Sequence, residues 1–475
     1  MYEYNIALYE KIKKGGICLN QVKNDTEKTN KMGTMPIGSL LLSMAWPPTL
    51  SMSINALYNV VDSVFVAMLS ERALTAVSLV MPLQMLMVAI GVGTGVGVNS
   101  LIARRLGEQR VDEASLAASV GIRLAFVNYF VMALIGIFLS SVFVGSFTKD
   151  ANVFSDATIY LRIITIGSFF FMLQLAMEKI IQSTGQMVLS MIVTVVGALV
   201  NLVLDPILIF GLLGAPKMGI AGAAVATIIG QAASSCVALY ICLKKISSIH
   251  IRIFGFRSDK KTIKDIYNVG LPSMVMMSIN SIMVLGYNAI LAAHATAIAV
   301  LGIYFKLQSI ILMPVFGVNQ AAMPILGYNF GARKKDRFME TYRKALGISV
   351  IIMIIGMALF QIFPRELLMI FSASDNMFNI GIPALRIISL CFVPAAFGII
   401  RSTVFQATGN GIYSLIASVV RQLVGILPIA YILMQIGGVT MSWYSFPIAE
   451  IMGFVLSSIL FRKLQNTKIN QLDTP

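Results

Sequence analysis

Three polar side chains stand inside long apolar stretches of the sequence, where they could bind a cation. Asp62 has no Lys or Arg within ten residues until Arg72. Asn201 and Asp205 are four residues apart, so on a helix they share one face. Pro206 follows and removes a backbone hydrogen bond, which frees a carbonyl group. Two carboxylates, an amide oxygen and a carbonyl form a set of hard oxygen ligands suited to Na⁺ as well as to H⁺.

The cost of an acid in a membrane supports this interpretation. A charged carboxylate at the centre of a bilayer costs about 2.5–3.5 kcal/mol on insertion scales. About 26 residues of helix at about 1.5 Å each separate Pro36 from Asp62, which places Asp62 beyond the midplane but still inside. If Asp62 and Asp205 approach each other, at least one should hold a proton or a cation. The alternatives are that Asp62 is a helix-end residue in water, and that Asp205 with Pro206 caps a turn before Gly211.

The composition indicates which elements position these residues. Of 475 residues 57% are hydrophobic and only 12% are charged, and the mean hydropathy is +0.83. Soluble chains are about a quarter charged, so an ordinary cytosolic enzyme, a nucleic-acid-binding protein and a disordered chain are excluded. The apolar runs are continuous rather than alternating, which excludes a β-barrel. We therefore expect an all-α polytopic membrane protein.

Twelve apolar stretches are long enough to cross a bilayer, which takes about 20 residues. They are 36–68, 74–101, 115–146, 156–182, 187–214, 219–243, 265–292, 298–327, 341–363, 379–406, 411–436 and 442–461.

The distribution of charge predicts the orientation. If the N-terminus is cytoplasmic, the inside segments hold about 25 Lys and Arg, against about four outside, namely Arg72, Lys149, Lys217 and Arg365. Cytoplasmic loops of membrane proteins collect Lys and Arg, so we expect both termini in the cytoplasm. This bias also explains the net charge of +15, and a nucleic-acid partner is not needed to account for it.

The chain is an internal duplication. The sequence QSTG at 182–185 recurs as QATG at 406–409, an offset of 224 residues, and LRII at 161–164 recurs as LRII at 385–388. A shift of 225 pairs Pro47 with Pro272. Each half holds six spans, so both halves have the same orientation and a pseudo-two-fold axis along the membrane normal should relate two six-helix lobes. One chain then forms both lobes, and we expect a monomer.

The duplication divides the chain into five parts. They are a polar N-terminal extension (1–33), a first lobe (34–243), a basic linker (244–264), a second lobe (265–463) and a tail (464–475).

The motifs resemble those of the multidrug and toxic compound extrusion (MATE) family, in particular its bacterial Mep-like branch. The resemblance covers nearly the whole chain from about residue 33. It rests on PP at 47–48, LYNVVDSVFVA at 57–67, GTG at 93–95, ARRLG at 103–107, NLVLDPILIFG at 201–211, GIAGAA at 219–224 and PILGYNFGA at 324–332.

The resemblance implies a transporter rather than an enzyme. It implies cation-coupled antiport that exports amphipathic, mostly cationic drugs across the bacterial cytoplasmic membrane, with H⁺ or Na⁺ as coupling ion and no cofactor. Rocking of two lobes around a central site would open it to one side at a time. The alternative is a flippase for lipid-linked saccharides from a related branch, which would favour the intramembrane basic residues Lys306, Arg401 and Arg421.

The resemblance also assigns residues to the coupling site. In one subgroup of the family the first lobe binds the ion through positions that match Asp62, Asn201, Asp205 and Thr227. Pro47 matches a proline at which the first span bends when the acid is protonated. Another subgroup uses an acid in span seven, but residues 270–292 here contain no Asp or Glu, and span ten carries Arg401. Coupling through the second lobe is therefore not expected.

Other ionisable residues lie within predicted spans. An unpaired charge there is costly, so structural pairs between helices or between lobes are expected, while Lys306 and Arg401 could instead bind anionic parts of a substrate. These residues are Glu178, Lys179, Lys306, Arg401, Arg421 and Glu450. The glycines at 91, 93, 95 and 97 have no strand before them and no Walker lysine, so they predict close helix packing rather than a nucleotide site.

Overall fold

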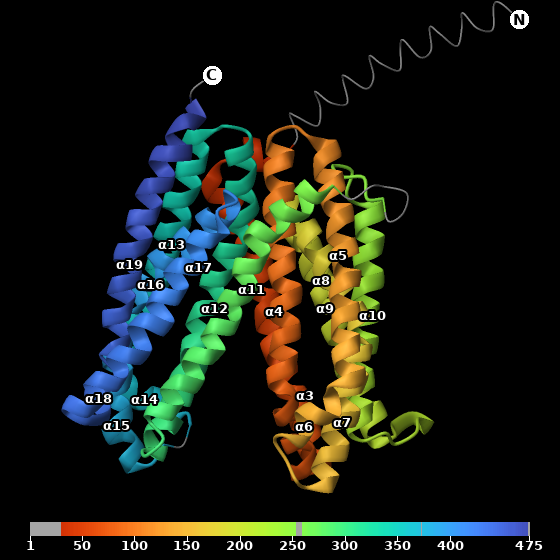
Figure 1. Cartoon of the computed structure of the whole chain (residues 1–475), viewed down its shortest axis with the longest axis vertical. Coiled ribbons are helices and arrows are strands. Elements are labelled where there is room, and N and C mark those ends of the chain that lie inside the picture. The colour runs from red at the N-terminus through yellow and green to blue at the C-terminus, as the bar shows by residue number, and fades with distance from the viewer. Residues whose placement is uncertain (1–29, 253–258, 372, 474–475) are drawn as a thin grey trace, which may run out of the picture.

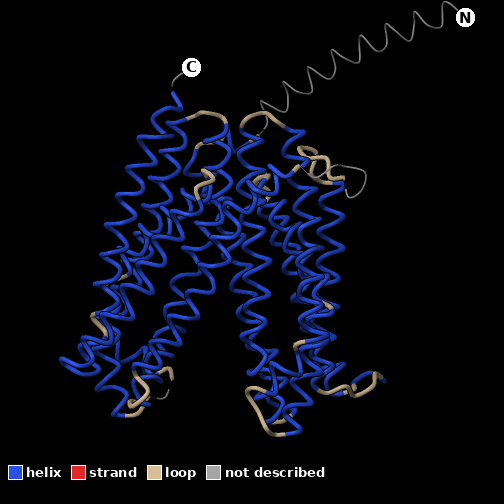
Figure 2. The backbone as a smooth tube through the Cα atoms, viewed as in Figure 1, coloured by secondary structure: helices blue, strands red, loops and turns tan. Residues whose placement is uncertain are grey.

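The computed structural model describes residues 30–252, 259–371 and 373–473, and this part of the chain contains helices and no strand. The helices form two groups that meet at the end where the described chain begins and ends, and that separate towards the opposite end (Figure 1). The longer loops lie near the two ends of the helices, and short breaks interrupt some helices along their length (Figure 2). We call the first end the basic end, because it carries the end of α4 with Arg105, the loops with Arg110 and Lys334, and the start of α13 at Lys335; we call the opposite one the distal end.

The first lobe contains the elements up to residue 244. The short helix α2 (Lys31–Thr34) precedes them, and they are α3 (Ile37–Leu69), α4 (Glu71–Gly107), α5 (Val111–Phe138), α6 (Ser140–Gly145), α7 (Ala151–Ile166), α8 (Ser168–Ser183), α9 (Met187–Phe210), η1 (Leu212–Gly214) and α10 (Ile220–Lys244).

The second lobe contains the remaining elements. They are α11 (Lys260–Ile290), α12 (Ala295–Gly331), α13 (Lys335–Ile362), α14 (Pro364–Met369), α15 (Asp375–Ser389), α16 (Phe392–Ala407), α17 (Gly411–Val419), η2 (Val420–Ile426), α18 (Leu427–Ser442), α19 (Ser445–Leu464), η3 (Gln465–Ile469) and η4 (Asn470–Asp473). In the described residues 10 helices are long and apolar enough to cross a membrane, and two bent pairs raise the number to 12. The predicted all-α fold of twelve spans in two lobes is thus confirmed.

Two spans are broken, whereas the sequence predicts them as continuous at 156–182 and 379–406. α7 and α8 meet at an angle of 45°, and α15 and α16 meet at 47°. At the first break the Thr165 hydroxyl donates to the carbonyl of Leu161, and at the second the Ser389 hydroxyl donates to that of Arg386. Such bonds from hydroxyl side chains to earlier carbonyls bend helices. A hydropathy pattern does not record the direction of a helix, so it cannot reveal the bends.

Several predicted spans differ from the helices in their bounds or their regularity. The span predicted at 115–146 ends at Phe138 and is followed by the short helix α6. The span predicted at 187–214 ends at Phe210, because Gly211 adopts a left-handed conformation (φ 77°) that terminates the helix. The span predicted at 411–436 contains a π-helical turn, η2, and α18 continues to Ser442 with non-helical backbone at Gly437 and Gly438.

The apolar core shows how the lobes are joined. One cluster at the basic end contains residues of both lobes, such as Met44 and Ile102 of the first and Ile325 and Phe405 of the second. A second cluster, which contains Tyr304, lies wholly within the second lobe, and a third lies wholly within the first. The lobes therefore share a core at the basic end and have separate cores towards the distal end.

Glycines allow α4 of the first lobe to approach α11 of the second. A Cβ atom at Gly97 would overlap the carbonyl oxygen of Ile266, and one at Gly93 would overlap the side chain of Met274. Gly95 packs against the stem of Lys179 in the same way. The predicted close packing at these glycines is confirmed.

The parts outside the lobes are described only in part. Residues 1–29 of the predicted extension and 253–258 of the predicted linker lie outside the described residues. The predicted tail continues α19 as two short helical turns, η3 and η4. The division of the chain into lobes at 34–243 and 265–463 remains a prediction.

Candidate functional site

The structure brings the two predicted carboxylates together. α3 and α9 lie side by side, and the side chains of Asp62 and Asp205 lie within hydrogen-bonding reach of each other. Asp205 is 0% exposed and Asp62 is half-buried. Asp205 lies inside α9, which continues through Pro206 to Phe210, so the alternative that Asp205 caps a turn is wrong. Asp62 likewise lies inside α3 rather than at its end.

Asn201 and Thr227 complete the predicted set. The Asn201 Nδ2 atom donates to Asp205 Oδ1 at 3.3 Å and to Thr227 Oγ1 at 3.4 Å. Thr227 Oγ1 in turn donates to the carbonyl of Ala223, one turn earlier on α10. Three helices, α3, α9 and α10, thus bring all four predicted residues into one cluster, which we call the acid cluster.

The acid cluster holds acceptor oxygens that have no donor. Asp62 Oδ1, Asn201 Oδ1 and Asp205 Oδ2 are each buried and have no hydrogen-bond partner among the described residues. In the same part of the chain, neither carboxylate forms an ion pair with Lys or Arg. A buried acceptor without a partner is costly. The donor set therefore fits a small cation, either a proton held between the carboxylates or a metal ion bound by several oxygens.

Three residues around the cluster were missed by the sequence analysis. Tyr58 and Tyr160 lie close enough to Asp62 for an electrostatic interaction, and Gln84 Nε2 donates to the Tyr160 hydroxyl at 3.5 Å. Tyr58 could have been found, because it precedes Asp62 by one helical turn and so shares its face. Tyr160 lies on α7, far from Asp62 in the sequence, so no spacing pattern connects it to the cluster.

Pro47 lies inside α3, which is helical on both sides of it. The hydroxyl of Ser51 donates to the Pro47 carbonyl at 3.0 Å. The predicted bend at Pro47 on protonation stays a prediction.

Comparison with known proteins identifies the family of the chain. The chain matches the family model described as MatE over residues 47–207 and 271–432, one match in each lobe. The chain belongs to the MATE family of efflux transporters. A multidrug export protein MepA of Staphylococcus haemolyticus is 23% identical over 90% of this chain and 93% of its own length, and a MepA of Staphylococcus aureus is 22% identical over 87% and 91%.

Solved structures agree as well. A multidrug resistance MATE transporter of the MOP superfamily, in an outward-facing conformation, superimposes with a TM-score of 0.85 at 25% identity. It covers 94% of this chain and 99% of its own. A MOP superfamily transporter from Pyrococcus furiosus, described as having a binding pocket of reverse polarity, gives the same score, identity and coverage.

The second lobe of this MATE protein has no acid cluster at the equivalent place. The offsets of the duplication map Asp62 to Tyr287 and Asp205 to Ile429. The Tyr287 hydroxyl donates to the carbonyl of Ser442 at 2.9 Å, and its ring stacks on Trp443. In the second lobe, the position equivalent to Asp62 is therefore occupied by an aromatic residue that packs on a second aromatic ring.

Glu178 and Lys179 form a buried network that reaches the other lobe. Gln182 donates from Nε2 to Glu178 Oε1 at 2.9 Å and accepts from Lys179 Nζ at 2.8 Å. Lys179 Nζ also donates to Gln320 Oε1 on α12, at 3.5 Å. The network links α8 to α12 across the lobe interface, in agreement with the expected pairing of lobes.

Arg401 has hydrogen bonds and ring contacts inside the second lobe, while its Nε atom has no hydrogen-bond partner among the described residues. Its Nη1 atom donates to Ser457 Oγ at 3.1 Å and Ser458 Oγ at 2.7 Å, and the guanidinium lies against the rings of Phe397 and Phe454. These contacts enclose the charge between α16 and α19. These contacts favour a structural role for Arg401 within the lobe, and its binding of an anionic part of a substrate stays a prediction.

Lys306 departs from the expected ion pairing. Its side chain is exposed, and its Nζ atom lies 5.9 Å from the centre of the Phe371 ring. Among the described residues no carboxylate forms an ion pair with it. Glu450, in contrast, has the expected partner: Arg421 Nη1 lies 3.2 Å from Glu450 Oε2.

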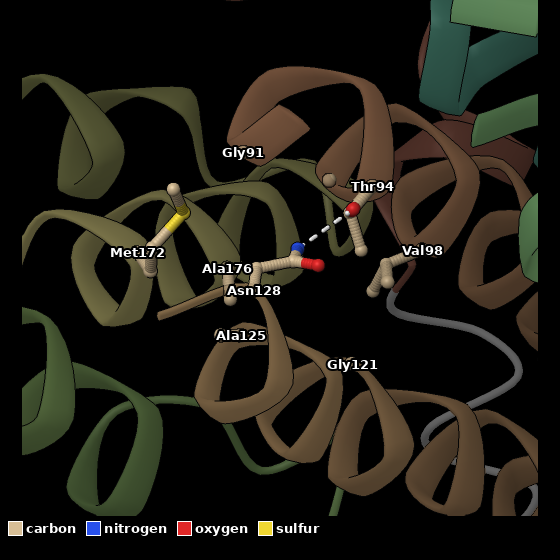
Figure 3. Close-up of a pocket in the computed structure, with 9 residues that line it drawn as sticks. Gly91, Thr94, Val98, Gly121, Ala125, Asn128, Met172 and Ala176 are labelled. Atoms are coloured by element: carbon tan, nitrogen blue, oxygen red, sulfur yellow. Dashed lines mark hydrogen bonds between the residues drawn. The ribbon is translucent and has the colours of Figure 1, made fainter. Parts of the chain in front are cut away.

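A small cavity lies within the first lobe, between α4, α5 and α8 (Figure 3). Asn128 Nδ2 donates to Thr94 Oγ1 at 2.9 Å on its wall, beside Met172 and Ala176. The cavity has room for about one water molecule (about 10 Å³). It contains no residue of the acid cluster and is too small for a drug, since drug sites take about 300–1,000 Å³.

Proposed function

We propose that this protein exports amphipathic, mostly cationic drugs across the bacterial cytoplasmic membrane in exchange for H⁺ or Na⁺. The acid cluster carries the proposal, because Asp62 and Asp205 face each other and leave buried acceptor oxygens without donors. The MepA relatives, described as multidrug export proteins, support the substrate class.

The arrangement of the lobes supports alternating access. Both termini of the described chain lie at the basic end, and the excess of Lys and Arg there favours a cytoplasmic location. The lobes share a core at that end and separate towards the distal end, so this conformation would face the outside. Closing the distal end and opening the basic end would expose a bound compound to the cytoplasm instead.

Cation binding would select between these conformations. A cation at the acid cluster neutralises repulsion between Asp62 and Asp205, and so changes how α3 packs on α9. Because α3 also packs on α12 of the second lobe, the change reaches the lobe interface. One charge crossing about 150 mV releases roughly 3.5 kcal/mol, enough for a gradient of a few hundredfold per ion.

Dye efflux from cells that express Asp62→Asn tests the proposal. The amide keeps the shape of the side chain but cannot exchange a cation, so export should fall to the background level while expression and the folded state are kept. Asp112→Asn is the matched control, because Asp112 is an exposed acid in the first turn of α5. Efflux by Asp62→Asn at the wild-type rate would overturn the proposal.

Everted vesicles separate the two coupling ions. Dye uptake into the vesicles is measured under an imposed proton gradient alone and under a sodium gradient alone. A response to either one supports antiport, and its absence in Asp205→Asn shows that the acid cluster carries the ion. Uptake that responds to neither gradient contradicts antiport.

A further inference from the structure

The second lobe contains a buried acid that the coupling mechanism does not use. The Glu450 side chain is 7% exposed and lies on α19, and Arg421 lies on η2. Arg421 Nη1 donates to both carboxylate oxygens, at 3.4 Å and 3.2 Å, and its stem packs on Gly453 one turn further along α19. Glu450 therefore fixes the position of the guanidinium.

Arg421 keeps hydrogen-bond donors that this pair does not occupy. Both recorded hydrogen bonds leave from Nη1, so in the described part of the chain Nε and Nη2 have no acceptor. The side chain is 29% exposed. A guanidinium presents five N–H donors in a planar fork that matches the two oxygens of a carboxylate or phosphate.

The depth of Arg421 indicates what its exposed part faces. It lies about ten residues, or about 15 Å, from the start of α17 at Gly411, which is half of a bilayer about 30 Å thick. A charged side chain at that depth costs about 2.5–3.5 kcal/mol in lipid and as a rule faces a polar space inside the protein. Both Arg401 and Arg421 keep N–H groups without an acceptor among the described residues. Arg401 is buried between two rings, whereas the side chain of Arg421 is 29% exposed, so a ligand can reach Arg421.

A polar group next to Arg421 along the chain also lacks a partner. Gln422 Oε1 is buried and has no hydrogen-bond partner among the described residues. Tyr304 lies close enough to both Arg421 and Glu450 for an electrostatic interaction. Arg421 itself sits in a π-helical turn, a feature often found at functional sites.

We propose that Arg421 binds an oxyanion group, such as a carboxylate, sulfonate or phosphate, of the compound that this protein exports. The inference rests on the proposed function and names a substrate determinant within it. The first lobe would bind the coupling cation and the second lobe would bind the anionic group, so zwitterionic amphiphiles should bind better than their esters. Glu450 acts as a positioning residue for Arg421.

Two dyes that differ in one group provide the probe. Rhodamine 110 carries a free carboxylate, and rhodamine 123 is its methyl ester. Binding to the purified full-length protein in detergent is measured by fluorescence anisotropy, which needs no ion gradient. Removing Arg421 alone would leave Glu450 buried without its partner, so the double variant Arg421→Gln/Glu450→Gln keeps the pair neutral.

We expect the wild-type protein to bind rhodamine 110 more tightly than rhodamine 123. In the double variant the ratio of the two affinities should shift by about tenfold or more towards the ester, as expected for the loss of charge-assisted hydrogen bonds. Arg421→Lys keeps the charge but loses the planar fork, so its ratio should fall between the two.

Three results would overturn the inference. The first is that the wild-type protein shows no preference for rhodamine 110. The second is that the double variant loses affinity equally for both dyes. The third is that the double variant binds both dyes as tightly as the wild type does. Failure of the proposed function would give a different result. Dye efflux would then not respond to ion gradients, while dye binding to the protein in detergent would still depend on Arg421.

Discussion

Gly107 and Gly331 occupy equivalent positions in the two repeats, and each lies against the backbone of the other lobe. A Cβ atom at Gly107 would overlap the carbonyl oxygen of Tyr328, and one at Gly331 would overlap that of Arg104. Arg104 and Tyr328 are themselves equivalent by the offset of 224 residues. The contact is therefore reciprocal, as in a two-fold interface between subunits, and the pseudo-two-fold axis passes through the basic end.

The first prediction concerns these glycines. Gly331→Ala must push the two helix ends apart, because the atom it meets is backbone and cannot rotate away. We expect a loss of about 1–3 kcal/mol in stability, measured as a lower melting temperature of the purified protein. Gly347→Ala on α13 is the control, since no atom lies within 4 Å of its Cβ position. Alanine there should be neutral or stabilising by up to about 1 kcal/mol, and equal effects of both changes would contradict the interpretation.

The second prediction concerns the amide of the acid cluster. Asn201→Ala removes the donor that holds Asp205 and Thr227 together. Losing one or two such bonds should weaken the apparent affinity for the coupling ion by about tenfold, measured from the ion dependence of dye efflux in vesicles. Asn128→Ala is the matched control, because it loses a buried bond to Thr94 in the same lobe but away from the cluster. The same loss of ion affinity in both variants would count against a specific role for Asn201.

The acid cluster could be predicted because acids in apolar segments are rare and costly. Asp62 and Asp205 stood out for that reason, and the four-residue spacing to Asn201 put a ligand on the same face. Thr227 has no such signal in its own segment and was identified only by resemblance. Tyr160 could not be found, since its contact with the cluster depends on how α7 packs.

Other features depend on geometry that composition does not encode. The bends at 166–168 and 389–392 arise from local hydroxyl bonds and close packing. The sequence grouped Arg401 and Arg421 as equivalent intramembrane cations. Only the packing distinguishes them, because Arg401 is buried between two rings and two serines while Arg421 pairs with one carboxylate and stays partly exposed.

The third prediction concerns the bond between Lys179 and Gln320, which joins the lobes. A double-mutant cycle with Lys179→Met and Gln320→Leu should give a coupling energy of about 0.5–1.5 kcal/mol in unfolding by SDS. Lys179→Met alone should be the more damaging change, because it also leaves Glu178 without its nearby cation. Single effects that add within about 0.3 kcal/mol would show that the two side chains do not interact.

The fourth prediction starts from the short helix α2, which both lobes hold at the basic end. Arg337 Nη2 donates to the carbonyls of Met32 and Met35, at 3.1 and 2.8 Å, and Asn329 Nδ2 also donates to Met32. These two donors belong to the second lobe. Met32 is 0% exposed, and its side chain lies against Gly185 of the first lobe. α2 is thus wedged between the lobes and must be released before the basic end can open.

Arg337→Gln should therefore make opening of the basic end easier. In a cysteine-free background that carries Met32→Cys, the wild-type protein should react slowly with a maleimide, and Arg337→Gln should accelerate the reaction about tenfold, since about 1.4 kcal/mol of lost bonding raises the open population by that factor. Arg343→Gln removes an exposed charge from the same helix, α13, and should leave the rate unchanged. Equal acceleration by both changes would point to surface charge rather than to the bonds with α2. If neither change accelerated labelling, the opening of the basic end would not be limited by this helix.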